Sequence, residues 1–577
     1  MRDLDLALEN GFIVDGTGSP GYSGSVGVKG DKIAAVVKGA AKLSAARVVD
    51  CNGLVIAPGF VDPHAHSDMT IFQHPTSENM VRLGITTELT GNCGTSAHAP
   101  SEEMTVRQYF DKLEEQRLNN NHAMFVGQGT VRRIVLGKQK RFSTPEEIEK
   151  MRSLVLTAMR EGCIGMSSGR PYIPGCFAST RECTELAKVV AEFEGLYTFH
   201  IQNQNEFIHQ ATQEVIDIGR RANIRVLIAH QKVVGKNNWG RAPEILGMME
   251  RAVDRGIDLQ SDVYPYTYSA VMMLGRILPK EITDVSSKEA AARLKDPNML
   301  AKIKDFVAKL PAEAAYVLSL LPQYGVVYCG KTKEYESMDL QEVADAKDMD
   351  LYEAILDLLA ENDLNVKIAG IMSEEDVQTF IKHPLSMIGT DAMSHDPEFD
   401  RKMGDAGVAG GVHPRAYGTH ARVLGRYVRE LGLLNLETAV KKMTSQPALH
   451  ARIYDRGLVR RNLNADLVVF DPLTVGETTT LDNPVSFPTG IPYVIVNGKM
   501  VVDKSEFLDS RPGKVHRDPQ GRWLWGGRAV GGSRRMKRDR GRVLEPALLV
   551  DFGSTYTKAA ASSVVSSRVA RWLRSHR

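Results

Sequence analysis

The sequence lacks the features that mark several protein classes. Its six cysteines lie at 51, 93, 163, 176, 183 and 329, with no CxxC pair among 577 residues. They are too sparse for a disulfide scaffold, and a reducing cytoplasm is the expected location. No apolar run approaches the roughly 18 residues that cross a bilayer, and the N-terminus has no secretory pattern. A net charge of +2 indicates neither a nucleic acid nor a membrane surface as partner.

What the sequence contains instead is a regular alternation of strand-like and helix-like segments. Long helical stretches such as 145–161 and 241–256 separate the apolar runs. Eight candidate strands occur at 55–62, 85–91, 123–127, 163–168, 196–201, 225–230, 258–263 and 386–391. This order predicts an α/β protein with a (β/α)₈ TIM-like barrel over 57–459. Helical, charged sequence at about 276–345 is expected to form an insertion over the barrel mouth.

The segments on either side of the barrel differ from it in pattern. Residues 1–56 and 460–510 contain short alternating strands with turn residues, so we expect them to combine into one small β-sandwich domain. Residues 511–577 begin with a stretch rich in glycine and arginine and are predicted to be a disordered basic tail.

Residues that can bind a metal follow five of the eight predicted strands. They are His64, His66, Cys93, His200, His230 and Asp391. Taken singly, each has a structural explanation, such as a buried polar histidine, a small apolar cysteine or a helix cap. Because the carboxyl ends of all barrel strands meet at one face, the six together favour a metal site. Alternate residues of an extended segment point the same way, so both histidines of Pro63-His64-Ala65-His66 can reach one ion.

With these motifs the chain resembles the amidohydrolase superfamily and, within it, the D-aminoacylase (N-acyl-D-amino-acid deacylase) family. The resemblance covers about residues 5–515. It rests on the HxH motif and on the stretches Gly91-Asn92-Cys93-Gly94, Asp262-Val263-Tyr264-Pro265-Tyr266 and His413-Pro414-Arg415.

The resemblance implies a zinc-dependent hydrolase that cleaves the amide bond of N-acyl-D-amino acids with metal-activated water. It assigns the tightly bound zinc to Cys93, His200 and His230. A second, weaker or vacant site would be formed by His64, His66 and Asp391, with Asp391 also the catalytic proton carrier. In many amidohydrolases a lysine of the fourth strand bridges two metals. The predicted fourth strand of this chain contains no lysine.

The substrate is expected to be a small N-acyl amino acid, whose carboxylate needs cationic or hydroxyl partners. Lys232 lies two residues after His230, and Arg415 can form a bidentate clamp. By resemblance, Tyr264, Tyr266 and Ser269 add hydrogen bonds. Arg170 and Gln202 depart from the family pattern, and with Tyr172 of the same loop as Arg170 they are candidate specificity positions. D or L stereochemistry, the acyl group, the metal count and the oligomeric state stay open.

Two alternatives to a deacylase remain. One is a cyclic-amide hydrolase of the dihydropyrimidinase or hydantoinase kind, and the other is a non-catalytic amidohydrolase-like scaffold. Residues 546–560 raise a separate question, because they resemble the first phosphate-binding hairpin of a MutL-like actin/Hsp70-type ATPase. Since the rest of such a domain is absent from the sequence, no ATPase function is expected.

Overall fold

Eight parallel strands form the barrel in this computed structural model. It describes residues 4–517 with gaps at 101–103, at 406–411 and within 279–323. The strand order is β16-β12-β11-β10-β9-β8-β7-β6, and every neighbouring pair is parallel. The strands are β6 Phe60–Asp62, β7 Ile85–Thr90, β8 Asn121–Gly127, β9 Gly165–Gly169, β10 Leu196–His200, β11 Arg225–Ile228, β12 Leu259–Val263 and β16 Ser386–Ile388. The predicted fold class is confirmed.

The first predicted strand, 55–62, is wrong as a single element. It divides into β5 Val55–Pro58, which belongs to a different sheet, and β6 of the barrel. Gly59 separates them, and a Cβ at this position would lie 2.3 Å from the Thr86 side chain. The close approach of backbone to strand β7 therefore requires glycine where the chain passes from one sheet to the other.

The first and last barrel strands meet just beyond their carboxyl ends. Asp391 donates its backbone N–H to the His64 carbonyl at 2.8 Å, and His66 donates to the Ala392 carbonyl at 2.6 Å. Ala65 and Ala392 form an isolated parallel bridge at the same place. The segments that close the barrel thus also carry three of the predicted metal ligands.

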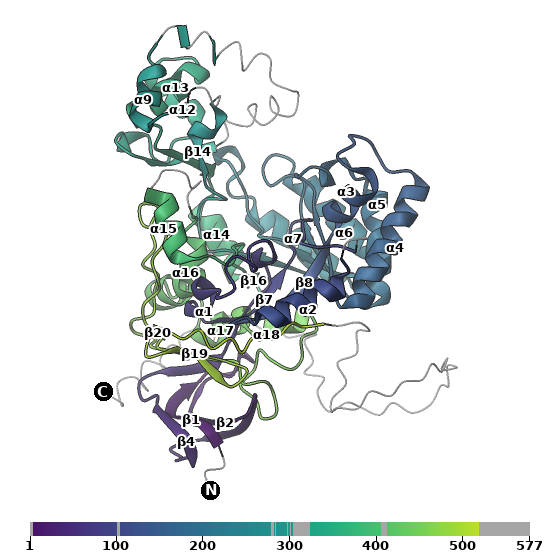
Figure 1. The fold of residues 1–577 in the computed structure, drawn as a ribbon, viewed down its shortest axis with the longest axis vertical. Helices are drawn as coiled ribbons and strands as arrows, with labels where there is room; N and C mark the ends of the chain where they lie inside the picture. The colour runs from purple at the N-terminus through teal and green to yellow at the C-terminus, as the bar shows by residue number, and fades with distance from the viewer. Residues whose placement is uncertain are drawn as a thin grey trace. The chain divides into compact units, whose positions relative to one another are not determined.

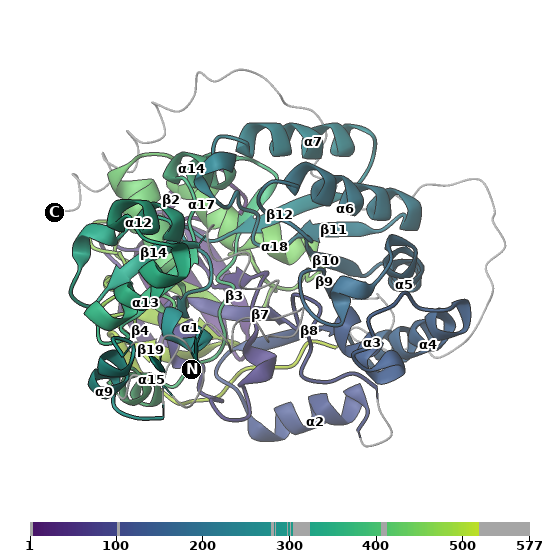
Figure 2. The same cartoon turned by 90° about the horizontal axis from the view of Figure 1, so that it is seen from above.

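Helices surround the strands, as the view from above shows (Figure 2). Thr144 illustrates why they begin where they do, because it forms a capping box with Glu147 ahead of a proline at the first helical position. The helices of the barrel region are α1 Glu78–Arg82, α2 Val106–Gln116, α3 Gln128–Leu136, α4 Pro145–Glu161, α5 Thr180–Glu192, α6 Ile208–Ala222, α7 Ala242–Asp254, α14 Glu374–Lys382, α15 Pro397–Asp405, α16 Arg415–Arg422, a π-helical segment Val423–Glu430, α17 Leu436–Met443 and α18 Ser445–His450.

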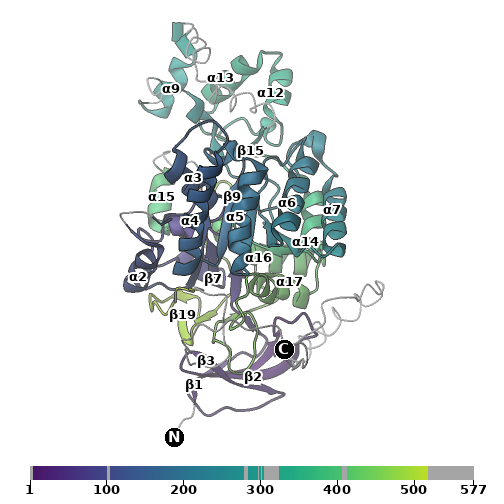
Figure 3. The ribbon, with the colours of Figure 1, turned by 90° about the vertical axis from the view of Figure 1, so that its right-hand side faces the viewer.

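A nine-stranded sheet joins segments from both sides of the barrel sequence (Figure 3). Its order is β20-β19-β18-β17-β5-β1-β2-β3, and β4 pairs with β1. The antiparallel pairing of β5 with β17 connects the N-terminal and C-terminal groups of strands. The remaining strands are β1 Leu4–Ile13, β2 Tyr22–Lys29, β3 Lys32–Lys38, β4 Ala45–Asp50, β17 Leu467–Phe470, β18 Tyr493–Val496, β19 Lys499–Asp503 and β20 Glu506–Phe507.

A separate layer lies between β12 and β16 in sequence and has its own apolar core (Figure 1). Its elements are β13 Met272–Met273, α9 Ser287–Arg293, β14 Tyr324–Cys329, α12 Leu340–Lys347, α13 Leu351–Glu361 and β15 Val366–Gly370. It extends beyond the predicted 276–345, because β15 is the central strand of its three-stranded sheet. Ser269, in the loop after β12, holds this layer through two hydrogen bonds of 2.9 Å. Its backbone N–H donates to the Gly370 carbonyl, and its hydroxyl accepts from the Gly370 N–H.

The start of the predicted disordered tail is instead part of the fold. Gly513 donates to the Leu118 carbonyl, His516 donates to the His122 carbonyl, and Val515 pairs with His122 beside β8. The rest of the predicted tail, including the ATPase-like stretch 546–560, lies outside the described residues. Within the described part of the chain, no helix is both long and apolar enough to cross a membrane.

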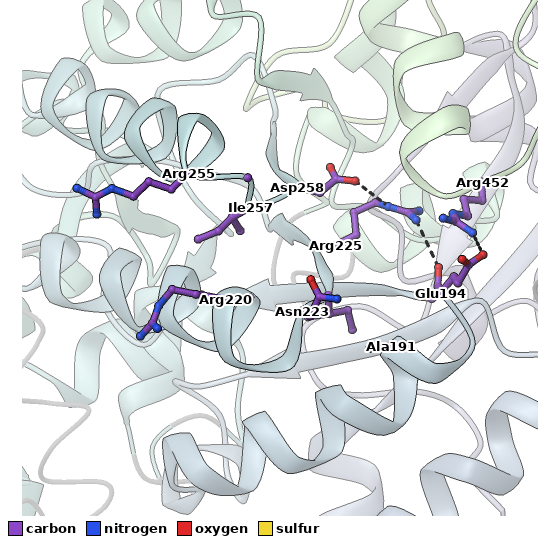
Figure 4. A pocket seen from close by; sticks show the side chains of 13 residues that line it. Ala191, Glu194, Arg220, Asn223, Arg225, Arg255, Ile257, Asp258 and Arg452 are labelled. Carbon is purple, nitrogen blue, oxygen red and sulfur yellow. Dashed lines mark hydrogen bonds and ion pairs between the residues drawn. The ribbon is translucent and has the colours of Figure 1, made fainter. Parts of the chain in front are cut away.

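A polar pocket of about 410 Å³ lies at the amino ends of β10–β12 (Figure 4). Arg225 pairs there with Asp258 at 3.0 Å, and Arg452 pairs with Glu194. Helices α5 and α6 end beside this pocket, so its arginines complement the partial negative charge of helix C-termini. In a barrel this end contributes stability, and the chemistry belongs to the opposite end.

Candidate metal centre

The six predicted ligands come together at the carboxyl end of the barrel. His64 and His66 follow β6, Cys93 follows β7, and His200 ends β10. Two groups of ligand atoms form, one from Cys93, His200 and His230 and the other from His64, His66, Cys93 and Asp391. The atoms of each group lie within 4.8 Å of one another. Cys93 belongs to both groups, so its sulfur lies between two potential metal positions.

The two sulfur–nitrogen distances in the first group fit a tetrahedral zinc site, and the nitrogen–nitrogen distance is shorter than such a site would have. Cys93 Sγ lies 3.3 Å from His200 Nδ1 and 3.4 Å from His230 Nε2, and the two nitrogens are 2.9 Å apart. Zn–S and Zn–N bonds of about 2.3 and 2.0–2.1 Å at tetrahedral angles place ligand atoms roughly 3.3–3.6 Å from one another. One thiolate and two imidazoles also form a soft donor set that suits zinc better than magnesium or calcium.

The second group surrounds one carboxylate oxygen. Asp391 Oδ1 lies 3.1 Å from His66 Nε2 and 3.5 Å from His64 Nε2. His64 Nε2 also lies 3.4 Å from Cys93 Sγ. This group is harder in its donors, because a carboxylate replaces one imidazole of the first group.

Three of the ligands have a backbone conformation that non-glycine residues seldom adopt. Cys93, His230 and Asp391 have φ values of 53°, 34° and 51°. Such left-handed residues carry local strain and concentrate at functional sites, where the surrounding structure holds them. For Cys93 the support comes from Ser167 of β9, which accepts from Gly94 N at 3.0 Å and donates to the Gly91 carbonyl at 2.5 Å. A serine of the fourth barrel strand thus fixes the cysteine loop.

Charges around the site favour the protonation states that metal binding needs. Burial opposes ionisation of Cys93, but the neighbouring imidazoles, His64 first among them, hold its pKa well below the ordinary value. Burial, with Lys232 next, keeps the pKa of His230 well below its ordinary value, so this imidazole is neutral. A thiolate and a neutral imidazole are the forms that ligate zinc.

Three of the predicted substrate-binding residues surround the ligands. Arg415 Nη1 lies 2.8 Å from Asp391 Oδ2, and Lys232 Nζ lies 2.9 Å from His230 Nδ1. The Tyr264 ring packs against both cations, 4.8 Å from the Arg415 guanidinium and 4.9 Å from the Lys232 ammonium. Among the described residues, the buried Tyr264 hydroxyl accepts or donates no hydrogen bond of ordinary geometry, although the Arg415 guanidinium lies near it.

Other predicted residues are engaged elsewhere. The Tyr266 hydroxyl donates to Glu477 at 2.8 Å, and Ser269 bonds Gly370 of β15. Arg170 is buried and donates to the backbone carbonyls of residues 175 and 178, so it secures its own loop. Gln202 is exposed.

Tyr172, in the same loop as Arg170, does reach the site. Its ring meets the edge of the His200 ring with centroids 4.9 Å apart, while about half of the residue (49%) stays exposed. Tyr172 therefore contacts a predicted metal ligand and is also open to solvent.

Sequence reasoning missed two residues that contact the predicted metal ligands. Asp262 Oδ1 lies 3.2 Å from His64 Nδ1, and Gln204 Nε2 lies 3.2 Å from His230 Nδ1. Asp262 carried a signal, because it lies inside a predicted barrel strand, where a buried carboxylate is costly unless it has a partner. Gln204 carried none, since it sits in a polar loop like many other amides.

A barrel with thiolate, imidazole and carboxylate ligands at its carboxyl end, beside cations for an anionic substrate, defines the class of metal-dependent hydrolases. Comparison with known proteins narrows the class. Residues 47–298 match the model of the Amidohydrolase family. A D-aminoacylase from Alcaligenes xylosoxydans xylosoxydans is 34% identical over 532 residues, which cover 89% of this chain and 98% of the relative. The chain therefore belongs to the amidohydrolase family, in its D-aminoacylase branch.

Solved structures agree with this placement. N-acyl-D-glutamate deacylase from Bordetella bronchiseptica, solved with zinc and a phosphonate that mimics the tetrahedral intermediate, has a TM-score of 0.69 and 30% identity. The match covers 89% of this chain and 99% of that one. A D-aminoacylase described with a binuclear metal centre has a TM-score of 0.69, 32% identity and coverages of 89% and 100%. L-hydantoinase from Arthrobacter aurescens, at 17% identity and a TM-score of 0.53, covers 89% and 100% and shares the fold alone.

Proposed function

We propose that this protein hydrolyses the amide bond of N-acyl-D-amino acids at a zinc ion held by Cys93, His200 and His230. The observation that carries the proposal is the Cys93 sulfur, which lies within 3.4 Å of imidazole nitrogens from both ligand groups. A D-aminoacylase at 34% identity and a zinc-complexed deacylase at 30% support the substrate class.

When bound, zinc supplies a water of lowered pKa and positive charge for the oxyanion that develops on the acyl carbonyl. Asp391 accepts the water proton and later delivers it to the leaving nitrogen. Although burial opposes it, the Arg415 guanidinium holds the pKa of Asp391 well below its usual value, so the carboxylate starts ionised. The products are a carboxylic acid and a free amino acid.

Lys232 is proposed to bind the substrate carboxylate. If His230 holds zinc through Nε2, its Nδ1 carries the proton and no longer accepts from the Lys232 ammonium. The ammonium then keeps only the Gln204 oxygen, 3.4 Å away. A buried cation with so few acceptors favours an incoming carboxylate. The Tyr264 ring packs against this ammonium, and its hydroxyl is proposed to donate a second hydrogen bond to the substrate.

The substrate side chain is proposed to be neutral. Among the residues that the structure describes, Lys232 and Arg415 are the lysine and arginine side chains found against the ligand groups. Lys232 is assigned to the substrate's own carboxylate, and Arg415 is paired with Asp391. No third cation is left to pair with a second carboxylate, and Tyr172 offers an aromatic surface instead.

The metal count is proposed to be one tightly bound zinc and one weaker position at His64, His66 and Asp391. Two features distinguish the weaker position: it has a carboxylate donor, and His66 is partly exposed (19%). The harder, more open position is expected to exchange its ion more readily.

Metal analysis and substrate comparison of the purified protein test the proposal. We expect at least one zinc per chain and hydrolysis of N-acetyl-D-amino acids but not of their L forms. Activity on hydantoins alone would support the cyclic-amide alternative. A well-folded protein without zinc or hydrolytic activity would support the scaffold alternative.

A further inference from the structure

Behind the two metal positions, the ligand histidines have opposite electrostatic partners. His64 Nδ1 faces the Asp262 carboxylate at 3.2 Å, and both side chains are fully buried. His230 Nδ1 faces the Lys232 ammonium at 2.9 Å and the neutral Gln204 amide at 3.2 Å. The second position is therefore backed by negative charge and the first by positive charge.

The carboxylate fixes which nitrogen of His64 is free. Asp262 accepts only if Nδ1 carries the proton, which leaves the lone pair of Nε2 directed toward Cys93 Sγ at 3.4 Å and Asp391 Oδ1 at 3.5 Å. A carboxylate behind a ligand histidine sets its tautomer and ring orientation and makes it a stronger donor. The Lys232 ammonium behind His230 has the reverse effect, because a positive charge makes that histidine a weaker donor to a metal.

The backbone around Asp262 and His64 leaves room for both side chains. Asp262 lies on β12, and its carbonyl accepts from Gln231 N at 2.7 Å, so the carboxylate stands on a rigid strand. Gly389 lies opposite, and a Cβ there would be 2.9 Å from Asp262 Oδ2 and 3.0 Å from His64 Cβ. Among the residues described by the structure, none forms a hydrogen bond with the buried Asp262 Oδ2. An unsatisfied buried carboxylate oxygen is expensive and calls for a role beyond packing.

We propose that Asp262 is a positioning residue that sets the occupancy of the second metal position through His64, without touching the first. This inference rests on the proposed zinc-dependent function and adds to it a residue that controls metal number. The carboxylate offsets the disadvantage of a position that shares its thiolate and is partly open to solvent.

The experiment uses the full-length protein, stripped of metal and titrated with zinc against a chromophoric chelator. In Asp262→Asn we expect the first zinc to bind within about threefold of wild type and the second to bind roughly 10–100-fold more weakly. Ser261→Ala is the matched control. Its hydroxyl lies on the other face of the same strand, 3.1 Å from the Ser386 hydroxyl, and both affinities should be unchanged.

Gly389→Ala tests the same pair without changing charge, and it serves if the asparagine variant does not fold. The added methyl group should displace Asp262 or His64 and weaken the second zinc alone. Equal second-site affinity in the variants and wild type would overturn the inference, as would equal loss of both metals or a wild type that binds one zinc only. A wild type that binds no zinc would instead overturn the proposed function.

Discussion

Arg415 Nη1 lies 2.8 Å from Asp391 Oδ2, so the proposed proton carrier is ion-paired with a buried guanidinium. The other oxygen of Asp391 faces His66 Nε2 at 3.1 Å. The carboxylate is therefore held from both sides in a fixed orientation, which keeps it ionised and aligned beside the metal positions. Residues 415 and 391 lie on different segments after the last barrel strand, and this ion pair joins the two segments.

Replacing the proton carrier should remove catalysis and leave the fold intact. For Asp391→Asn we expect kcat to fall by about 10²–10⁴, the usual contribution of general acid–base catalysis. Steady-state kinetics measure the loss, and circular dichroism checks the fold. Glu398→Gln, at an exposed carboxylate on α15, should keep wild-type kinetics. A kcat within about threefold of wild type in the Asp391 variant would exclude this role.

Lys232→Met should weaken binding of the substrate carboxylate specifically. A hydrogen bond to a charged group contributes about 1.5–3 kcal/mol, so we expect KM for N-acetyl-D-amino acids to rise roughly 10–150-fold. The matching N-acetyl-D-amino acid amides lack the carboxylate, and the variant should process them as wild type does. Lys236→Met removes a partly exposed lysine four residues further along the same loop and serves as control. Equal effects on acids and amides would argue against a carboxylate contact.

Neutral side chains should be preferred over acidic ones. Leaving a second substrate carboxylate unpaired costs about 2 kcal/mol or more, which corresponds to at least a roughly 30-fold lower kcat/KM for N-acetyl-D-glutamate than for N-acetyl-D-leucine. Tyr172→Ala should lower kcat/KM for N-acetyl-D-leucine and leave the zinc content unchanged. Preference for the acidic substrate would contradict the proposal, because it would require a cation other than Lys232 and Arg415 beside the substrate side chain.

Lys442 should make stability depend on pH. Burial lowers its pKa to about 7, against 10.5 in the unfolded chain. Between these values the unfolded chain binds more protons, so stability rises with pH from about 7 toward 10.5 and is lowest below 7. Thermal unfolding at pH 6.5 and 9 should show wild type gaining on Lys442→Met at the higher pH. Lys150→Met, at an exposed site on α4, should show no such change. A pH-independent difference for Lys442→Met would contradict the assignment.

Sequence reasoning could place the ligands because barrel geometry makes strand ends converge. His64, Cys93, His200, His230 and Asp391 all follow strands that the apolar pattern revealed, so their meeting required only the fold. The joining of N-terminal and C-terminal strands into one small domain was predicted from their strand-like pattern, but the place of β5 in that sheet was not, because residues 55–62 were predicted to be a single barrel strand.

The direction of individual side chains was less accessible. Arg170 and Tyr172 are two residues apart, yet Arg170 turns into its own loop and Tyr172 meets His200. Tyr266 and Ser269 bond to Glu477 and Gly370, partners more than one hundred residues away in sequence. Such choices depend on long-range packing. The passage between sheets at Gly59 depends on a close backbone approach that no local pattern records.

The most direct test is zinc-dependent hydrolysis of N-acetyl-D-leucine by the metal-free protein, with wild type and Cys93→Ala titrated in parallel. Wild type should gain activity as the first equivalent of zinc binds, and Cys93→Ala should bind zinc weakly and stay inactive at the same concentrations. Full activity of the metal-free protein, or unchanged zinc affinity and activity in Cys93→Ala, would contradict a zinc centre built on this thiolate.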